Sequence, residues 1–182
     1  MDTELVTQAQ HGDKAAFAAI AAALADRYLA TSHRILRDIA LAEDATQQAL
    51  LAIWQDLPQL RDPARFDAWS YRLLVRACYA ESDRARRLGP NLRLLETDEP
   101  TAPDGITNVV DRDQLDRAFR RLPLDQRVVV VLRHYLDLNS DEVAETLGIP
   151  IGTVASRLHY AMRGLRAALD ADARPPIREA AQ

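Results

Sequence analysis

The segment that most constrains the fold is "NSDEVAETLGIPIGTVASRLHYAM", residues 139–162, where two helical patterns flank a glycine and a proline. The first pattern predicts a short helix over residues 140–147. Gly148 tolerates a left-handed backbone, so residues 148–150 are expected to form a tight turn. A longer helix is predicted over residues 151–169. Two helices joined by a short turn that contains glycine form a helix-turn-helix.

The residues of this hairpin suit two helices that cross at close range. Ser140 is the expected N-cap of the first helix, and Ala144 is small where the helices approach each other. Val154 is expected to return to the shared core. The apolar seam is completed by Val143, Leu147, Leu158 and Leu165.

The outward face of the second helix carries hydrogen-bonding and basic side chains. Between Pro150 and Leu169 the chain has three arginines and no acidic residue. Arginine can contact DNA phosphates, while threonine, serine and histidine can bond to base edges. A basic helix face is also common on helical bundles, so the spacing alone leaves a DNA-binding and a purely structural hairpin open. The face consists of Thr153, Ser156, Arg157, His159, Tyr160 and Arg163.

The rest of the chain also has helical periodicity, which predicts an all-α protein. The four valines at 128–131 favour a strand by propensity. A helix is nevertheless expected there, because Leu124, Val128 and Leu132 follow a helical stripe and the neighbouring segments are helical. The other predicted helices cover residues 13–37, 42–57, 63–87 and 111–122, and the valine helix covers residues 123–138.

A change of composition divides these helices into two groups. Residues 88–105 contain three prolines, two glycines and four acidic residues, which is typical of a flexible acidic linker. A packed loop of this length inside one domain would be unusual. We therefore expect two small helical domains, at residues 1–88 and 111–171, with a linker at 89–110 and a frayed tail at 172–182.

The bulk properties argue against several classes of function. The net charge is −4, so DNA binding would depend on local basic patches. The four histidines have no ligand spacing and no phosphate loop is present, so we predict no enzyme activity, metal or cofactor. The polar start and the lack of a long apolar run predict a cytoplasmic protein without membrane insertion. Cys78, the single cysteine, lies among apolar residues and is expected to be inert core rather than a redox sensor.

The segment from Leu122 to Leu169 resembles the C-terminal promoter-reading domain of the extracytoplasmic function (ECF) sigma factors of bacterial RNA polymerase. Two motifs carry the resemblance, an L-P-x-x-x-R opening and a G-T-V-x-S-R-L-x-x-A close. They correspond to Leu122, Pro123 and Arg127, and to Gly152, Thr153, Val154, Ser156, Arg157, Leu158 and Ala161. In the family this domain binds the minus-thirty-five element. The resemblance implies DNA contacts from Arg133, Thr153, Ser156, Arg157, His159 and Arg163.

The N-terminal half is similar to the other domain of the same family, through its D-A-x-Q run, a tryptophan on the same helix, and the following A-W-x-Y-R motif. The resemblance implies two roles. The helix at 42–57 would dock on core polymerase, whose β′ clamp helices and β flap are the implied partners, through Asp44, Gln47, Gln48, Leu51 and Trp54. The next helix would hold the opened minus-ten element of the promoter DNA through Arg61, Arg65, Trp69, Tyr71, Arg72 and Arg76.

Three positions depart from the family pattern. Ala155 and Tyr160 stand where many members have basic residues, which should weaken phosphate contacts and change which bases are read. Arg76 stands where many members have asparagine, which leaves the minus-ten preference open.

Two functions other than that of a sigma factor are also considered. One is a helix-turn-helix regulator that binds DNA without polymerase, but no receiver domain precedes these helices. The other is a helical adaptor that binds only protein, and it would not direct promoter-specific transcription. An anti-sigma factor is a possible further partner, since the family is often inhibited by one.

Overall fold

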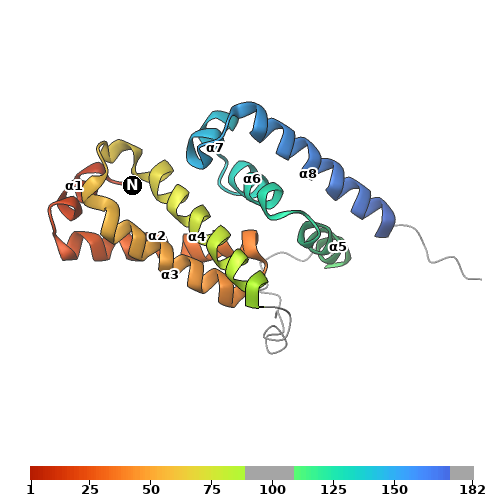
Figure 1. Cartoon of the computed structure of the whole chain (residues 1–182), viewed down its shortest axis with the longest axis horizontal. Coiled ribbons are helices and arrows are strands. Elements are labelled where there is room, and N and C mark those ends of the chain that lie inside the picture. Colours follow the sequence, from red (N-terminus) through yellow and green to blue (C-terminus); the bar gives the residue numbers. More distant parts are fainter. Residues whose placement is uncertain (89–108, 173–182) are drawn as a thin grey trace, which may run out of the picture.

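The computed structural model describes residues 1–88 and 109–172, and within them every regular element is a helix (Figure 1). The side chains of residues 109–113 and 172 are not among those described. The expected linker falls almost entirely outside these ranges, as does most of the expected tail. The all-α prediction is confirmed for the part of the chain that the structure describes.

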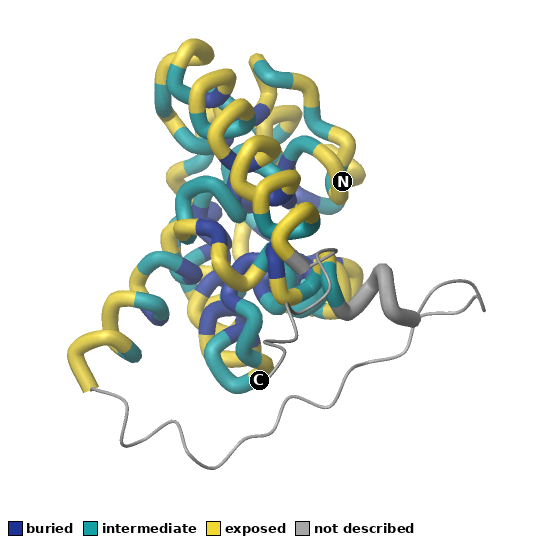
Figure 2. Tube along the Cα trace, turned by 90° about the vertical axis from the view of Figure 1, so that its right-hand side faces the viewer, coloured by how far each residue is buried: buried dark blue, intermediate teal, exposed yellow. Residues whose placement is uncertain are grey.

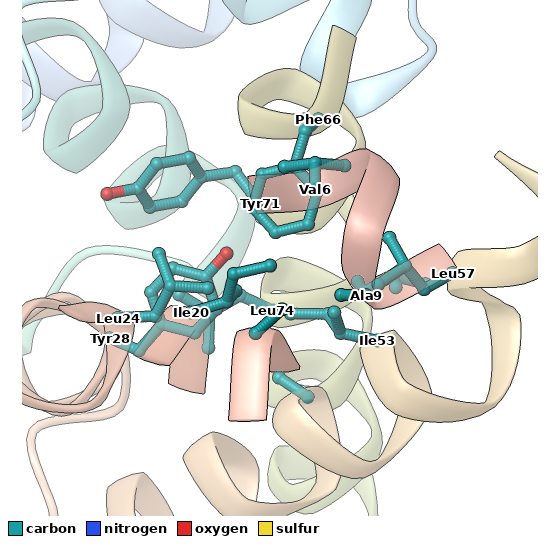
Figure 3. Close-up of a cluster of buried hydrophobic side chains, with 13 residues drawn as sticks. Val6, Ala9, Ile20, Leu24, Tyr28, Ile53, Leu57, Phe66, Tyr71 and Leu74 are labelled. Atoms are coloured by element: carbon teal, nitrogen blue, oxygen red, sulfur yellow. The ribbon is translucent and has the colours of Figure 1, made fainter. Parts of the chain in front are cut away.

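Four α-helices and two short 3-10 helices form the N-terminal half. The order is α1 Thr3–Gln10, α2 Lys14–Leu36, α3 Ile39–Asp56, η1 Leu57–Gln59, η2 Pro63–Arg65 and α4 Phe66–Leu88. Their apolar faces meet in a core that includes Ile20, Tyr28, Ile53 and Leu74, all fully buried (Figure 3). On α3 and directly after it, one buried stripe consists of Ala45, Ala49, Ile53 and Leu57.

Aspartate side chains fix where these helices begin. Asp13 accepts hydrogen bonds from the backbone N–H groups of Ala15 and Ala16, and Asp38 accepts one from Leu41. The Asp62 side chain accepts from the Ala64 N–H and caps η2, and α4 continues directly from η2. The predicted break before residue 42 is too long, because the Asp38 cap lets α3 start at Ile39.

The C-terminal half consists of α5 Val109–Arg120, α6 Leu124–His134, α7 Ser140–Leu147 and α8 Ile151–Asp172. The valine run is helical, as predicted, and Val128, Val129 and Val131 are buried. The helix ends at His134 rather than at residue 138, and Asp137 has a left-handed φ of 54° in the loop that follows. Tertiary burial of the valines therefore outweighs their β propensity.

The helix-turn-helix forms with one correction to its cap. Gly148 has φ 65° and its N–H bonds to the carbonyls that end α7, as expected for a left-handed C-terminal residue. The N-cap is Asn139, not Ser140. The Asn139 side chain accepts bonds from Asp141 and Glu142, while the Glu142 carboxylate accepts from the Asn139 N–H. This reciprocal capping box places the N-cap one residue earlier than the sequence indicated, while the helix itself covers residues 140–147 as predicted.

Replacing Asn139 by alanine is expected to lower the free energy of unfolding by about 1 kcal/mol, because two backbone N–H groups lose their acceptor. The matched variant Ser140→Ala should change stability much less, since Ser140 is the first residue inside the helix. Urea unfolding of both variants measures the difference. Equal losses, or a larger loss for Ser140→Ala, would contradict the capping assignment.

The two halves pack directly against each other. Helix α2 lies against α6, and α4 lies against α7. Figure 1 shows the two halves side by side, and in Figure 2 the buried residues, in dark blue, gather in the interior of the molecule. A shared apolar cluster joins them, with members from both halves. It consists of Ile35, Leu36, Ala45, Val75 and Cys78 from the N-terminal half, and Val128, Val129, Val131, Leu132, Val143 and Val154 from the C-terminal half. Sequence periodicity assigned these residues to helix faces but did not show that the faces meet.

Candidate functional site

An apolar groove runs along the outer side of α2 and α3. Its volume is about 400 Å³, and Phe17, Leu50, Leu51 and Trp54 contribute to its lining. Leu51 and Trp54 are 47% and 40% exposed, which is unusual for such large apolar side chains. The Trp54 ring packs edge-on against Phe17, with 4.6 Å between ring centroids. This contact holds the indole in place while one side stays open to solvent.

The residues predicted to dock on polymerase lie together on this side of α3. All five are exposed, and Gln47, Leu51 and Trp54 line the groove itself. Asp44 lies 4.0 Å from Arg84, a loose surface ion pair that leaves its carboxylate accessible. The structure therefore brings together Asp44, Gln47, Gln48, Leu51 and Trp54 as one surface of mixed polar and apolar character.

The aromatic residues of α4 have three different environments. Phe66 is buried, and Trp69 is half-buried with its ring centroid 5.9 Å from that of Phe66. Tyr71 corrects the sequence prediction, because it is 3% exposed and packs against Tyr28 at 5.2 Å in the N-terminal core (Figure 3). Burial raises the pKa of the Tyr71 phenol to about 12. Tyr71 is a core residue, so it cannot stack on a base from this position.

The predicted minus-ten arginines divide into exposed and occupied side chains. Arg61, Arg65 and Arg76 are exposed, whereas Arg72 is half-buried. Arg72 donates from Nε to the Thr146 carbonyl at 3.1 Å and from Nη2 to the Glu145 carbonyl. Arg65 pairs with the Glu145 carboxylate at 3.3 Å. Two of the four arginines thus contact α7 in this structure.

The predicted reading face of α8 is largely open. Ser156, His159 and Arg163 are exposed, and Thr153 is half-buried near the helix start. Val154 and Ala161 are fully buried on the opposite face, so the predicted separation of inner and outer faces is confirmed. Arg133, on α6, is half-buried.

Arg157 is held by an acid that the sequence did not indicate. Its Nε lies 3.2 Å from a carboxylate oxygen of Asp125, at the start of α6. Two acids of α7 have other partners, because Glu142 closes the capping box and Glu145 faces Arg65. The Arg157 side chain remains 28% exposed, so the pair lies at the edge of the reading face.

Cys78 lies in the shared cluster and is fully buried, with its thiol 3.5 Å from the Ser32 hydroxyl. Burial raises the pKa of the thiol to about 11, which disfavours the reactive thiolate. This environment agrees with the core assignment made from sequence.

Two known protein families match the two halves of the chain. Sigma-70 region 2 matches residues 20–88, and Sigma-70, region 4 matches residues 112–165. The ECF RNA polymerase sigma factor SigL of Mycobacterium tuberculosis is 34% identical over 165 residues, covering 87% of this chain and 93% of SigL. The chain belongs to the ECF sigma factors. It is therefore an alternative sigma factor, a transcription initiation factor that binds core RNA polymerase and directs it to promoter DNA.

Two solved structures share the fold of this sigma factor. CnrH in complex with the cytosolic domain of CnrY has a TM-score of 0.68 at 24% identity, covering 94% of this chain and 98% of CnrH. The sigma factor RpoE of Bartonella quintana, in complex with the anti-sigma factor NepR, has a TM-score of 0.67 at 20% identity, covering 86% and 98%. Among the described helices of this sigma factor, none is long and apolar enough to cross a membrane.

Proposed function

We propose that the sigma factor divides promoter recognition among three helices. Helix α3 docks on core polymerase, α4 and the loop before it hold the opened minus-ten element, and α8 reads the minus-thirty-five element. The domain division at residues 1–88 and 111–171 follows the same assignment. The observation that carries it is the match of region 2 to the first half and of region 4 to the second.

The surface chemistry of each helix supports its role. The open groove beside Trp54 offers apolar contact area with a polar edge, as protein interfaces require. Arg61, Arg65 and Arg76 supply exposed positive charge before and along α4. On α8, Ser156 and His159 offer hydrogen-bonding groups beside Arg163, and this combination suits base edges next to phosphates.

Two further features of the proposal come from the relatives. A cytoplasmic location follows from the role, because core polymerase acts there. An anti-sigma factor is a proposed partner, supported by the complex of RpoE with NepR as a fold relative. Co-purification from cells, under conditions where the sigma factor is silent, tests for such a partner.

A substitution at Arg157 tests the proposal that α8 reads the minus-thirty-five element. Replacing Arg157 by alanine is expected to weaken holoenzyme binding to all minus-thirty-five sequences about equally, and to reduce the salt dependence by roughly one phosphate contact. Ser156→Ala should instead relax preference at one or two positions, by about 1–3 kcal/mol each. Binding of promoter variants, measured over a range of salt concentrations, separates the two effects.

Asp125→Asn is the matched control for this test, because it removes the ion pair but keeps the Arg157 charge. If Arg157 contacts a phosphate, Asp125→Asn keeps the salt dependence of wild type. If Arg157 only braces α8 against α6, both variants lower the melting temperature alike and neither changes the salt dependence. That second result would overturn the phosphate contact.

A further inference from the structure

A hollow of about 250 Å³ lies where α4 meets the helix-turn-helix. Three of the residues that line it are arginines, and like charges around so small a space repel each other. Both halves of the chain contribute to its wall. The lining consists of Arg72, Val75, Arg76 and Tyr79 of α4, Thr146 and Leu147 of α7, Ile149 of the turn, and Arg157 of α8.

The positive charge around the hollow exceeds the negative charge. Arg157 pairs with Asp125, with 3.2 Å between Nε and a carboxylate oxygen. Arg72 instead donates to two backbone carbonyls of α7, which are neutral acceptors. Arg76 is exposed and forms no ion pair with any residue that the structure describes. Within the described part of the chain, Arg72 and Arg76 therefore have no carboxylate partner.

Thr146 supplies a hydrogen-bonding group that the protein itself leaves unused. The residue is 1% exposed, and its hydroxyl has no hydrogen-bond partner among the described residues. A buried hydroxyl without a partner lowers stability, so such groups are rare unless water or a ligand bonds to them. Because Thr146 lines the hollow, an oxygen atom there can accept from this hydroxyl.

Tyr79 adds a second hydroxyl to the wall of the hollow. Burial raises the pKa of its phenol, while the Arg157 and Asp125 charges act on it in opposite directions. The phenol therefore keeps its proton and can donate to an acceptor. Apolar side chains complete the wall and lower the local dielectric, which strengthens each charged hydrogen bond.

These donors suit phosphoryl groups. Phosphate groups combine several acceptor oxygens with more than one negative charge, and arginine binds them through two parallel N–H bonds. A carboxylate has a single charge to set against Arg72 and Arg76. The volume limits the size of the ligand, because pockets for drug-sized molecules measure about 300–1,000 Å³. The hollow therefore accommodates one or two phosphoryl groups rather than a nucleic-acid chain.

We propose that this hollow is a binding site for a small phosphorylated anion with a diphosphate group. Arg72, Arg76 and Arg157 balance its charge, and the hydroxyls of Thr146 and Tyr79 donate to its oxygens. The site needs neither polymerase nor promoter, so it is independent of the proposed function. Because α4, α7 and α8 all contribute, the bound anion stabilises the folded chain.

Inorganic pyrophosphate is the probe, titrated into the full chain by calorimetry in magnesium-free buffer of about 0.15 M ionic strength. Wild type is expected to bind one pyrophosphate with a Kd below about 100 μM. The melting temperature should rise by about 3–6 °C at about ten times Kd. Sulfate at the same ionic strength controls for general anion effects. No binding of pyrophosphate, or an equal rise with sulfate, overturns the proposal.

Thr146→Val separates ligand binding from folding. Valine has a similar shape without the hydroxyl, so this variant should be at least as stable as wild type but bind pyrophosphate about five- to tenfold more weakly. Arg76→Gln should weaken binding at least ~10-fold. The matched control Arg166→Gln removes an exposed charge of α8 outside the hollow and should bind like wild type. Wild-type affinity in both Thr146→Val and Arg76→Gln would remove the site.

A DNA phosphate is the other source of the same chemistry, and a second titration distinguishes it. Binding of a mixed-sequence single-stranded oligonucleotide to wild type and Thr146→Val is measured by fluorescence anisotropy. Equal DNA affinity is expected, because the oligonucleotide is too large for the hollow, while pyrophosphate binding by the variant falls. A parallel loss of DNA binding would assign the hollow to the DNA backbone and overturn the small-anion site.

Discussion

The double substitution Asp44→Arg with Leu51→Arg is expected to abolish association with core RNA polymerase while the sigma factor stays folded. Both side chains are exposed on α3, and Leu51 lines the groove beside Trp54. Two arginines would place charge where an apolar contact and an acidic group are proposed to meet the partner. Loss of such an anchor typically costs several kcal/mol, so we expect affinity to fall at least ~100-fold.

Co-purification with core polymerase measures this effect, with a thermal melt to confirm folding. The control is Glu4→Arg with Ala22→Arg, which adds the same two arginines at exposed positions on α1 and α2. The control should bind like wild type. A folded Asp44→Arg, Leu51→Arg chain that still co-purifies would remove α3 from the docking surface.

Leu132→Ala is expected to lower the free energy of unfolding by about 2–5 kcal/mol. Leu132 is fully buried in the cluster shared by both halves, so its truncation removes apolar burial and leaves a cavity. Leu115→Ala is the matched control, because Leu115 is 48% exposed on α5 and should change stability by no more than about 0.5 kcal/mol. Urea unfolding compares them. Similar losses would mean that the shared cluster contributes little to stability.

Most of the fold could be predicted from hydrophobic periodicity and sequence motifs. The apolar stripe through the valine run gave the correct helix despite a strand-like composition, because burial of one face decided the outcome. The turn was predicted correctly from Gly148, because a left-handed φ of 65° costs little for a residue without a Cβ atom. The N-cap was misplaced by one residue because Asn139 and Ser140 are both good caps, and only the reciprocal bond with Glu142 distinguishes them.

The features that could not be predicted from the sequence depend on contacts between segments that are distant along the chain. Tyr71 belongs to the A-W-x-Y-R motif and was assigned to DNA, yet its ring packs on Tyr28 of α2. Asp125 is 32 residues from Arg157 along the chain, so nothing local indicated their ion pair. Likewise, Glu145 appeared to be an ordinary acid on a short helix. Its position opposite Arg65 follows only from the packing of α7 on α4.

In vitro transcription with core polymerase over a randomised promoter library tests the central claim most directly. The account predicts that this sigma factor selects promoters with two conserved blocks, at the minus-thirty-five and minus-ten positions, and that Ser156→Ala relaxes only the upstream block. Initiation should also disappear with Asp44→Arg, Leu51→Arg. Transcripts that start without any shared upstream block, or no sigma-dependent transcripts at all from a folded chain, would contradict it.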